Sequence, residues 1–187
     1  YICTALANSK PVILLHSELI YVFTKNGWAS CRDIFINSGG IQHYSLKTFL
    51  RKMELFRALG LSESTLAALE KKGFSKPSPI QERTIPTLLS TDKDVVGQAQ
   101  TGTGKTAAFG LPLIERLDEN SSQVQALILC PTRELAVQVA EEIMSFRGGK
   151  KLSVLPIYGG QSYEIQIRGL RKGAQIVVGT PGRVQDH

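Results

Sequence analysis

Cysteine is scarce in this chain of 187 residues, and the three that occur, Cys3, Cys31 and Cys130, lie far apart. No CxxC pair or histidine cluster accompanies them, so neither a disulfide framework nor a zinc site is indicated. Because structural disulfides belong to oxidising compartments, their absence favours a reducing one, and we expect a cytoplasmic protein.

Long apolar runs are missing as well. The strongest candidate, residues 11–23, is too short to cross a bilayer and carries His16, Ser17 and Glu18 at its centre. No basic start with a small-residue cleavage site frames it as a signal peptide. We therefore expect a buried strand or helix here and no membrane partner.

The composition that remains is that of an ordinary globular domain, with 42% hydrophobic and 20% charged residues. The formal net charge of +6 favours a polyanionic partner. Several scattered basic residues are better interpreted as solvated helix faces or loops, namely Lys71, Lys72, Lys150, Lys151, Arg168, Arg171 and Lys172.

Residues 1–52 show no clear helical or strand periodicity and stay unassigned, whereas the sequence becomes regular from Met53 onward. One interpretation makes Met53 the initiator, with 1–52 as translated upstream sequence or a poorly packed appendage. The competing interpretation is a genuine extension in which residues 11–23 pack on the domain. We expect the first and place the domain at 53–187.

Apolar runs alternate with amphipathic segments over the second half of the chain. This order predicts an α/β fold, in which helices cover both faces of a parallel sheet. Ligands of such sheets bind at the carboxyl ends of the strands. Two helices are expected earlier, over 62–73 and from Pro79, with Ser78 as the cap. The expected strands are 94–98, 124–130, 152–158 and 175–179, and the expected helices between them are 104–117, 132–146 and 161–172. In the last helix, we expect Ile165, Ile167 and Leu170 in the core.

Residues 99–106, AQTGTGKT, join an expected strand to an expected helix. Glycine loses much backbone freedom on folding, so this composition indicates a loop that bends sharply or approaches a ligand closely. The spacing matches a phosphate-binding loop, with Ala99 where the first glycine usually stands. Lys105 would then reach the β- and γ-phosphates, and Thr106 would offer its hydroxyl to Mg²⁺. The alternative is a glycine-rich turn that ends by chance in Lys-Thr.

A second stretch, GFSKPSPIQ at 73–81, indicates which nucleotide would bind. The Gln81 amide both donates and accepts hydrogen bonds, so it can pair with the N6 and N7 edge of adenine. Taken alone, the stretch is equally well explained as a helix entrance with two prolines.

Together these stretches resemble the DEAD-box ATP-dependent RNA helicases. The matching segments are the Q motif at 73–81, motif I at 99–106, motif Ia (PTREL) at 131–135, the glycine doublet at 159–160 and motif Ib (TPGR) at 180–183. The motifs occur in the same order as in the family, and the sequence most resembles that of its bacterial cold-shock and ribosome-assembly branch. The resemblance implies a three-layer, P-loop (RecA-like) parallel sheet that is incomplete at its C-terminus.

The resemblance also implies roles for individual residues. Gln81 would read adenine, Phe74 and Lys76 would lie against the nucleotide, and Phe56 would support that pocket. The phosphates of ATP would be held by Ala99, Gln100, Thr101, Gly102, Thr103, Gly104, Lys105 and Thr106, with Mg²⁺ on Thr106. One RNA strand would follow Pro131, Thr132, Arg133, Gly159, Gly160, Gln161, Thr180, Pro181, Gly182 and Arg183.

The chemistry of the second set agrees with an RNA path. Arg133 and Arg183 can contact phosphates, and the glycines let a backbone approach closely. Such contacts read the sugar–phosphate backbone, so we expect binding that is largely independent of sequence. The plainer alternatives are an ion pair between Arg133 and Glu134 or another neighbour, and an ordinary capped turn at 180–183.

The motif that names the family is missing, because no DExD pattern occurs in the chain. In the family, it supplies the carboxylates that hold Mg²⁺ and position the attacking water. The Ser-Ala-Thr motif and the second RecA-like domain are absent too. Since phosphoryl transfer depends on such groups, we expect this chain alone to be inactive.

The resemblance implies that the intact protein couples ATP hydrolysis to RNA binding and local duplex unwinding. The alternative is a non-catalytic nucleotide- or RNA-binding protein with a P-loop.

Overall fold

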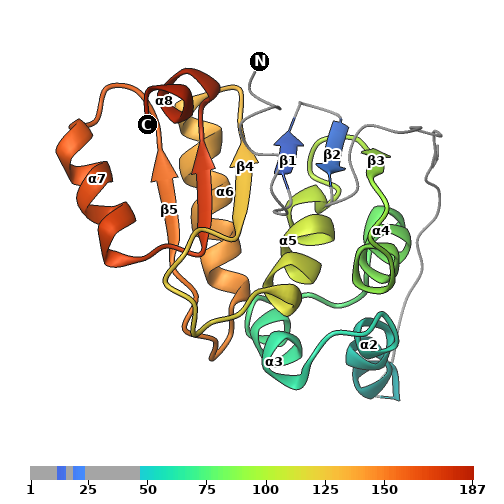
Figure 1. Cartoon of the computed structure of the whole chain (residues 1–187). Helices are drawn as coiled ribbons and strands as arrows, with labels where there is room; N and C mark the ends of the chain where they lie inside the picture. Colours follow the sequence, from blue (N-terminus) through green and yellow to red (C-terminus); the bar gives the residue numbers. More distant parts are fainter. Residues whose placement is uncertain (1–11, 16–18, 24–46) are drawn as a thin grey trace.

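Six strands form one sheet in this computed structural model, which describes residues 12–15, 19–23 and 47–187 (Figure 1). Cys3 and Cys31 lie outside the described residues. The strands are β1 (Val12–Leu15), β2 (Leu19–Phe23), β3 (Val95–Gln98), β4 (Ala126–Leu129), β5 (Val154–Ile157) and β6 (Ile176–Gly179). The helices are α2 (Lys47–Ala58), α3 (Glu63–Lys71), α4 (Pro79–Ser90), α5 (Lys105–Arg116), α6 (Arg133–Phe146), α7 (Tyr163–Lys172) and α8 (Pro181–Asp186).

The strands lie in the order β3-β2-β1-β4-β6-β5. β4, β5 and β6 are parallel, and β1 pairs in parallel with β4, whereas β2 is antiparallel to both β1 and β3. The four strands expected from the sequence therefore run in one direction, but β1 and β2 separate β3 from β4 and make the sheet mixed. Only residues 16–18 connect β1 to β2, and so short a connection suits antiparallel neighbours, since a parallel pair needs a long crossover.

The described part of residues 1–52 thus contains regular structure that its sequence pattern did not reveal. The apolar run 11–23 is strand over β1 and β2, which was one of the two alternatives expected for it, and Ile13 is buried. α2 begins at Lys47 and passes through Met53, so the helix crosses the boundary expected there.

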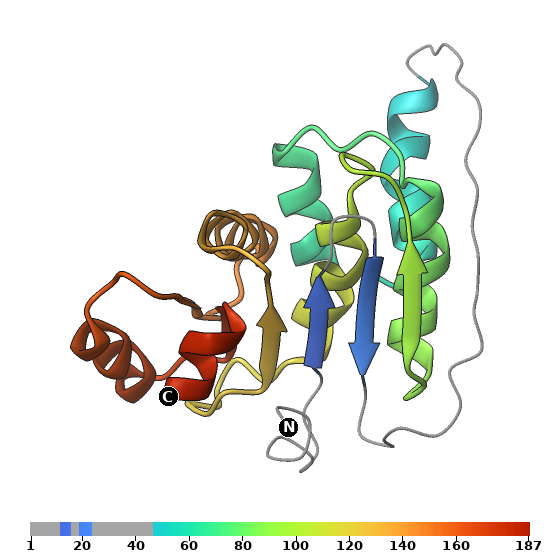
Figure 2. The same ribbon diagram turned by 90° about the horizontal axis from the view of Figure 1, so that it is seen from above.

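Helices cover both faces of the sheet, as the sequence predicted. In Figure 2, α2 to α6 lie on one side of the strands and α7 and α8 on the other. Ile128 of β4 points into the larger core on the first side, while its neighbours Leu127 and Leu129 face the second side. This alternation is the period of a β-strand. The three-layer α/β arrangement is confirmed.

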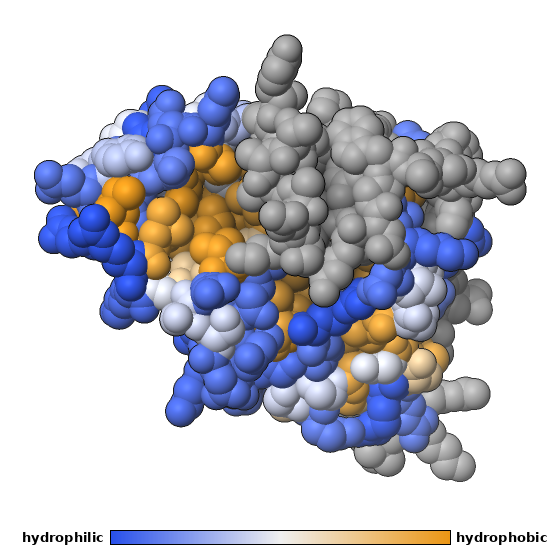
Figure 3. Space-filling view, in the orientation of Figure 1, coloured by the Kyte–Doolittle hydropathy of each residue, from blue (hydrophilic) through white to orange (hydrophobic). Residues whose placement is uncertain are grey.

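The second side of the sheet has a smaller apolar cluster. Leu170 of α7 and Val184 of α8 pack there, together with Val124 and Leu155, and all four are only partly buried. Figure 3 shows an apolar area on this face, between α7 and the strands.

The face that α7 turns inward differs from the expected one. Ile165, expected in the core, is 50% exposed, and Gln166 is the buried residue of this helix, at 1% exposure. Ile167 and Leu170 are half-buried beside Gln166, because residues three and four apart share one side of a helix. The expectation for Ile165 was wrong because residues two apart, such as 165 and 167, cannot face the same side.

Three further observations bear on function. No helix among the described residues is long and apolar enough to cross a membrane. The described residues also contain no cluster of three or more histidine, cysteine or acidic side chains that could hold a metal ion. Burial raises the pKa of the Cys130 thiol to about 12, so this free cysteine stays protonated and unreactive at neutral pH.

Candidate functional site

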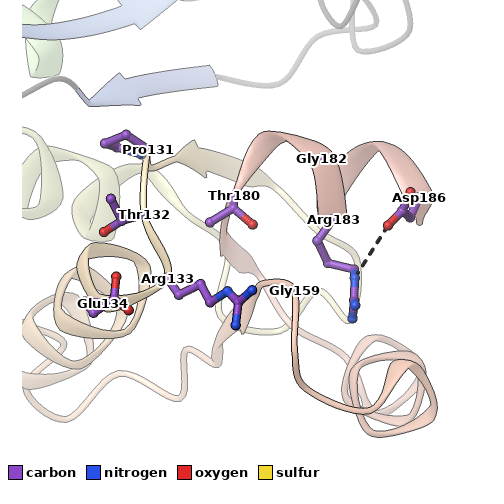
Figure 4. Close-up of a pocket in the computed structure, with 9 residues that line it drawn as sticks. All are labelled: Pro131, Thr132, Arg133, Glu134, Gly159, Thr180, Gly182, Arg183 and Asp186. Carbon is purple, nitrogen blue, oxygen red and sulfur yellow. Dashed lines mark ion pairs between the residues drawn. The ribbon is translucent and has the colours of Figure 1, made fainter.

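Three segments meet where β4, β5 and β6 end, and they line a pocket of about 510 Å³ (Figure 4). Parallel strands bring the loops that follow them to one edge of the sheet, so distant parts of the chain become neighbours. The pocket contains the residues expected on the RNA path except Gly160, Gln161 and Pro181, which lie one or two positions from lining residues in the chain. The lining residues are Pro131, Thr132, Arg133, Glu134, Gly159, Thr180, Gly182, Arg183 and Asp186.

Arg133 begins α6 and lies against the glycine doublet. Thr132 caps the helix, because its hydroxyl accepts a hydrogen bond from the Leu135 N–H at 3.3 Å. A β-carbon at position 160 would stand 2.5 Å from Nη1 of Arg133, and Gly160 adopts a φ of +93°. The backbone conformation therefore favours glycine at 160, and any added β-carbon would displace the Arg133 guanidinium.

The plainer alternative for Arg133 is not what the structure contains. Within the described part of the chain, no ion pair joins Arg133 to Glu134 or to another carboxylate. The pKa of Glu134 is lowered mainly by hydrogen bonds with its own backbone N–H and with Thr132, and only to a small extent by the charge of Arg133. The Arg133 cation is therefore available to an anion in the pocket.

Arg183 is held by its neighbours instead. Its Nη1 donates to the Gln161 carbonyl at 3.0 Å and to Oε1 of Gln166 at 3.2 Å. Its Nε lies 3.6 Å from a carboxylate oxygen of Asp186, the ion pair drawn in Figure 4. The TPGR segment thus begins α8, with Thr180 at the N-cap position, where its side chain makes no cap hydrogen bond, and Pro181 as the first residue. The same turn places Arg183 in the pocket wall.

The sequence interpretation missed two residues of this region, Gln166 and Asp186. Gln166 carries a detectable signal, since it is a polar residue on the face of α7 that also presents Ile167 and Leu170. Asp186 stands three positions after Arg183 in a short helix, which is a common ion-pair spacing.

The glycine-rich loop at 99–104 lies at the carboxyl end of β3 and leads into α5, as expected. Gly102 and Gly104 adopt φ values of +78° and +79°, which L side chains rarely adopt. Lys105 folds back over the loop, and its Nζ donates to the carbonyls of Ala99 and Gln100, both at 2.7 Å. Thr103 donates to the same Gln100 carbonyl at 2.7 Å. The ammonium group therefore occupies the concave side of the loop together with backbone oxygens.

Gln81 joins the 73–81 stretch to this loop. The residue is buried in the first turn of α4, where its Oε1 accepts a hydrogen bond from the Ser78 N–H at 3.0 Å. Its Nε2 donates to the Gly104 carbonyl at 3.0 Å. A β-carbon at position 104 would collide with the Gln81 amide. Ser78 and Gln81 form a capping box at the start of α4, and the Oγ of Ser78 is buried beside the Gln81 amide.

The aromatic residues expected near the nucleotide form a chain of edge-to-face contacts. Phe56 is buried and its ring centroid lies 6.1 Å from that of Phe74, which in turn lies 5.9 Å from that of Phe146. Phe56 therefore packs against Phe74 in the core. Lys76 is exposed, and Thr106 is half-buried in the first turn of α5.

The expected site residues thus form two groups on one edge of the sheet. The Gln81, Gly104 and Lys105 group lies at the end of β3, and the Arg133 and Arg183 group lies at the ends of β4, β5 and β6. β1 and β2 lie between the two groups in the strand order.

Comparisons with known proteins agree with this arrangement. The model of the DEAD/DEAH box helicase family matches residues 78–187. The DEAD-box ATP-dependent RNA helicase CshA of Geobacillus kaustophilus is 55% identical over 135 residues, which are 72% of this chain and 29% of that relative. CshA of Listeria monocytogenes is 54% identical over the same number of residues, which make up 26% of its length. The chain therefore spans less than a third of these relatives.

Solved structures of the same family share the fold. A DEAD box protein from the hyperthermophile Methanococcus jannaschii matches 71% of this chain and 36% of its own, with 50% identity and a TM-score of 0.66. Dbp5 of S. cerevisiae, bound to RNA and ADP BeF3, matches 70% of this chain and 33% of its own, with 37% identity and a TM-score of 0.63. Because the family model covers more than half of the chain and the motifs lie where the fold requires them, the chain belongs to the DEAD/DEAH box helicase family.

Proposed function

We propose that this chain is the nucleotide- and RNA-binding part of an ATP-dependent RNA helicase. The observation that carries the proposal is the meeting of Arg133, Arg183 and Gly159 in one pocket, on the same sheet edge as the glycine-rich loop. In the intact protein, ATP hydrolysis would be coupled to RNA binding and local unwinding, with a second RecA-like domain of the same protein as partner.

The pocket suits a sugar–phosphate backbone. Two guanidinium groups, from Arg133 and Arg183, provide charge-assisted donors for phosphate oxygens. The positive end of α6 adds to the attraction for an anion. Gly159 and Gly182 leave room for a chain to approach the backbone, and contacts of this kind go to phosphate and sugar. A relative of this fold, Dbp5, is bound to RNA in its solved structure.

The glycine-rich loop suits the phosphates of a nucleotide. Its glycines permit a backbone bend, and the first turn of α5 carries N–H groups without intrahelical partners. A phosphate would give the Lys105 ammonium a stronger, charged acceptor in place of two neutral carbonyls. The Ser78 hydroxyl and the Gln81 amide beside it offer polar groups to a base.

This geometry supports the individual roles that the family resemblance implies. Ala99 to Thr106 would hold the phosphates of ATP, Gln81 would contact adenine, and the Thr106 hydroxyl would ligate Mg²⁺, which supplies charge neutralisation during phosphoryl transfer. All these residues lie within 53–187, and the CshA relatives align over 135 residues, as many as this stretch contains. We therefore place the helicase unit at 53–187 and expect it to act in a reducing, cytoplasmic compartment.

RNA binding by the full-length protein tests the proposal. Arg133→Gln and Arg183→Gln should each weaken binding of a single-stranded RNA, and each should reduce the slope of log K against log salt by about 0.7. Two RNAs of unrelated sequence should lose affinity equally, because the contacts are to the backbone. Fluorescence anisotropy over a salt series measures both quantities.

The matched control is Arg171→Gln, an exposed arginine in the last turn of α7, at the other end of the fold from the pocket. It should leave affinity and slope unchanged. Equal salt slopes for all three variants and the parent would remove the pocket from the RNA path. Loss confined to one of the two RNAs would instead indicate base recognition and contradict the backbone mode.

A further inference from the structure

We propose that Gln166 is a positioning residue whose side-chain amide fixes Arg183 and the segment after β5 as parts of one anion-binding wall. The inference rests on the proposed RNA-binding function of the pocket. Gln166 is 1% exposed, although it belongs to α7, a helix whose other residues are at least partly exposed. A buried amide is costly unless its hydrogen-bonding groups find partners, so the contacts of Gln166 explain its burial.

Gln166 makes every hydrogen bond that its amide can make. Its Nε2 donates to the Tyr158 carbonyl at 2.9 Å and to Oε1 of Gln161 at 3.0 Å. Its Oε1 accepts from Nη1 of Arg183 at 3.2 Å and contacts Nε2 of His187 at 2.9 Å. An amide has two N–H donors and two acceptor positions, so the group is saturated.

The orientation of the amide is determined by two of these partners. The Tyr158 carbonyl can only accept a hydrogen bond, and the Arg183 guanidinium can only donate. Nε2 must therefore face Tyr158, and Oε1 must face Arg183. It follows that His187 also donates to Oε1, so its neutral ring carries the hydrogen on Nε2.

These contacts link the two walls of the pocket that contain the cations. Tyr158 and Gln161 flank the glycine doublet, and Gly160 of that doublet lies against the guanidinium of Arg133. Arg183 is held both by the Gln161 carbonyl and by Gln166 itself. One buried side chain thus joins the Gln161 carbonyl in setting the separation between the glycine doublet and the second arginine.

A second buried glutamine provides a matched control. Gln175 is 6% exposed and stands just before β6, at the end of that strand away from the pocket. Its Oε1 accepts from the Ser153 N–H at 2.8 Å, and its Nε2 donates to the Ser121 carbonyl. Gln175 is therefore a buried, hydrogen-bonded glutamine like Gln166, with two amide hydrogen bonds in place of four and no contact to either arginine.

The ordering of Arg183 tests the proposal without RNA. Methionine replaces glutamine at similar volume and removes the polar atoms. In the full-length protein, we expect ¹⁵N relaxation to report an ordered Arg183 Nε–H group in the parent and in Gln175→Met, and a mobile one in Gln166→Met. An equally ordered Arg183 in Gln166→Met would overturn the proposal. If Gln166→Met does not fold, the tautomer of neutral His187 in the parent protein provides the test. The bonding of the Gln166 amide requires the hydrogen on Nε2 of His187, so a hydrogen on Nδ1 would overturn the proposal.

RNA binding tests the consequence. Gln166→Met should weaken binding of single-stranded RNA about fivefold and reduce the salt slope as Arg183→Met does, while Gln175→Met binds like the parent. The Gln166→Met/Arg183→Met double variant should lose no more RNA affinity than Arg183→Met alone, because both substitutions remove the same contact between Arg183 and RNA.

Additive losses of affinity in the double variant would overturn the positioning role. If Arg183→Met binds RNA like the parent while Gln166→Met still mobilises Arg183, the positioning role stands and the proposed RNA path falls.

Discussion

Gly160 allows the Arg133 guanidinium to lie closer to the backbone than any side chain would permit. The residue combines a left-handed φ of +93° with a β-carbon position already occupied by Arg133. By contrast, Gly149 has neither a left-handed φ nor a neighbour within 4 Å of its β-carbon position. Of these two glycines, only Gly160 therefore contacts a residue that lines the pocket.

Gly160→Ala should weaken RNA binding about tenfold and lower the free energy of unfolding by about 1–2 kcal/mol. The added methyl group displaces the Arg133 guanidinium, and the backbone conformation is strained for alanine. Anisotropy titration and urea unfolding measure the two effects, with Gly149→Ala as the control. The same affinity and stability in both variants would show that the glycine doublet does not place Arg133.

Glu115 of α5 contacts both the start of α3 and the segment after α6, at the end of the molecule away from the pocket. From the last turn of α5, its carboxylate accepts hydrogen bonds from the N–H and hydroxyl of Ser62, the cap of α3, at 3.0 and 2.8 Å. Its other oxygen lies 2.9 Å from Nζ of Lys150, in the segment after α6, and both side chains are mostly buried. Burial alone would raise the pKa of this carboxyl, but hydrogen bonds from Thr65, Lys150 and Ser62 outweigh it and hold the pKa below its ordinary value.

Glu115→Gln should therefore destabilise the fold by about 2 kcal/mol near neutral pH, because it leaves Lys150 without its charged partner. A carboxyl whose pKa is lowered in the folded state stabilises the protein above its unfolded pKa, and this contribution is lost as pH falls through the folded value. The difference between parent and variant should thus shrink below a pH of about 4.5. Thermal unfolding over a pH series measures this stability difference, and a difference that grew towards acid pH would contradict the prediction.

The control is Glu63→Gln, which removes the exposed partner of Arg57 and should change the stability much less.

The arrangement of the whole molecule was predictable where local pattern determines structure. β3 to β6 consist of short, nearly continuous apolar runs, and α6 repeats Val139 and Ile143 at helical spacing, so their types and approximate bounds could be inferred. The pocket was predictable because parallel strands bring their following loops to one edge. The motif residues therefore came together as expected around Arg133 and Arg183.

Features that depend on distant partners were not predictable from the sequence. The place of β1 and β2 between β3 and β4 depends on which strand edges are available, which no local pattern records. The inward face of α7 depends on Gln166, whose burial makes sense only with Tyr158 and Arg183 beside it. Likewise, the hydrogen bond from Gln81 to Gly104 joins two motifs that are separate in the sequence.

RNA-stimulated ATP hydrolysis by the full-length protein, compared between the parent and Lys105→Ala, is the decisive measurement. Lys105 is the cation of the glycine-rich loop, so its loss should lower the RNA-stimulated rate about 100-fold or more. Lys172→Ala, at an exposed position at the end of α7, should hydrolyse ATP like the parent. Stimulation by RNA in the parent and its loss in Lys105→Ala alone is the expected result. Undiminished RNA-stimulated hydrolysis by Lys105→Ala would contradict the assignment of this loop as the nucleotide site.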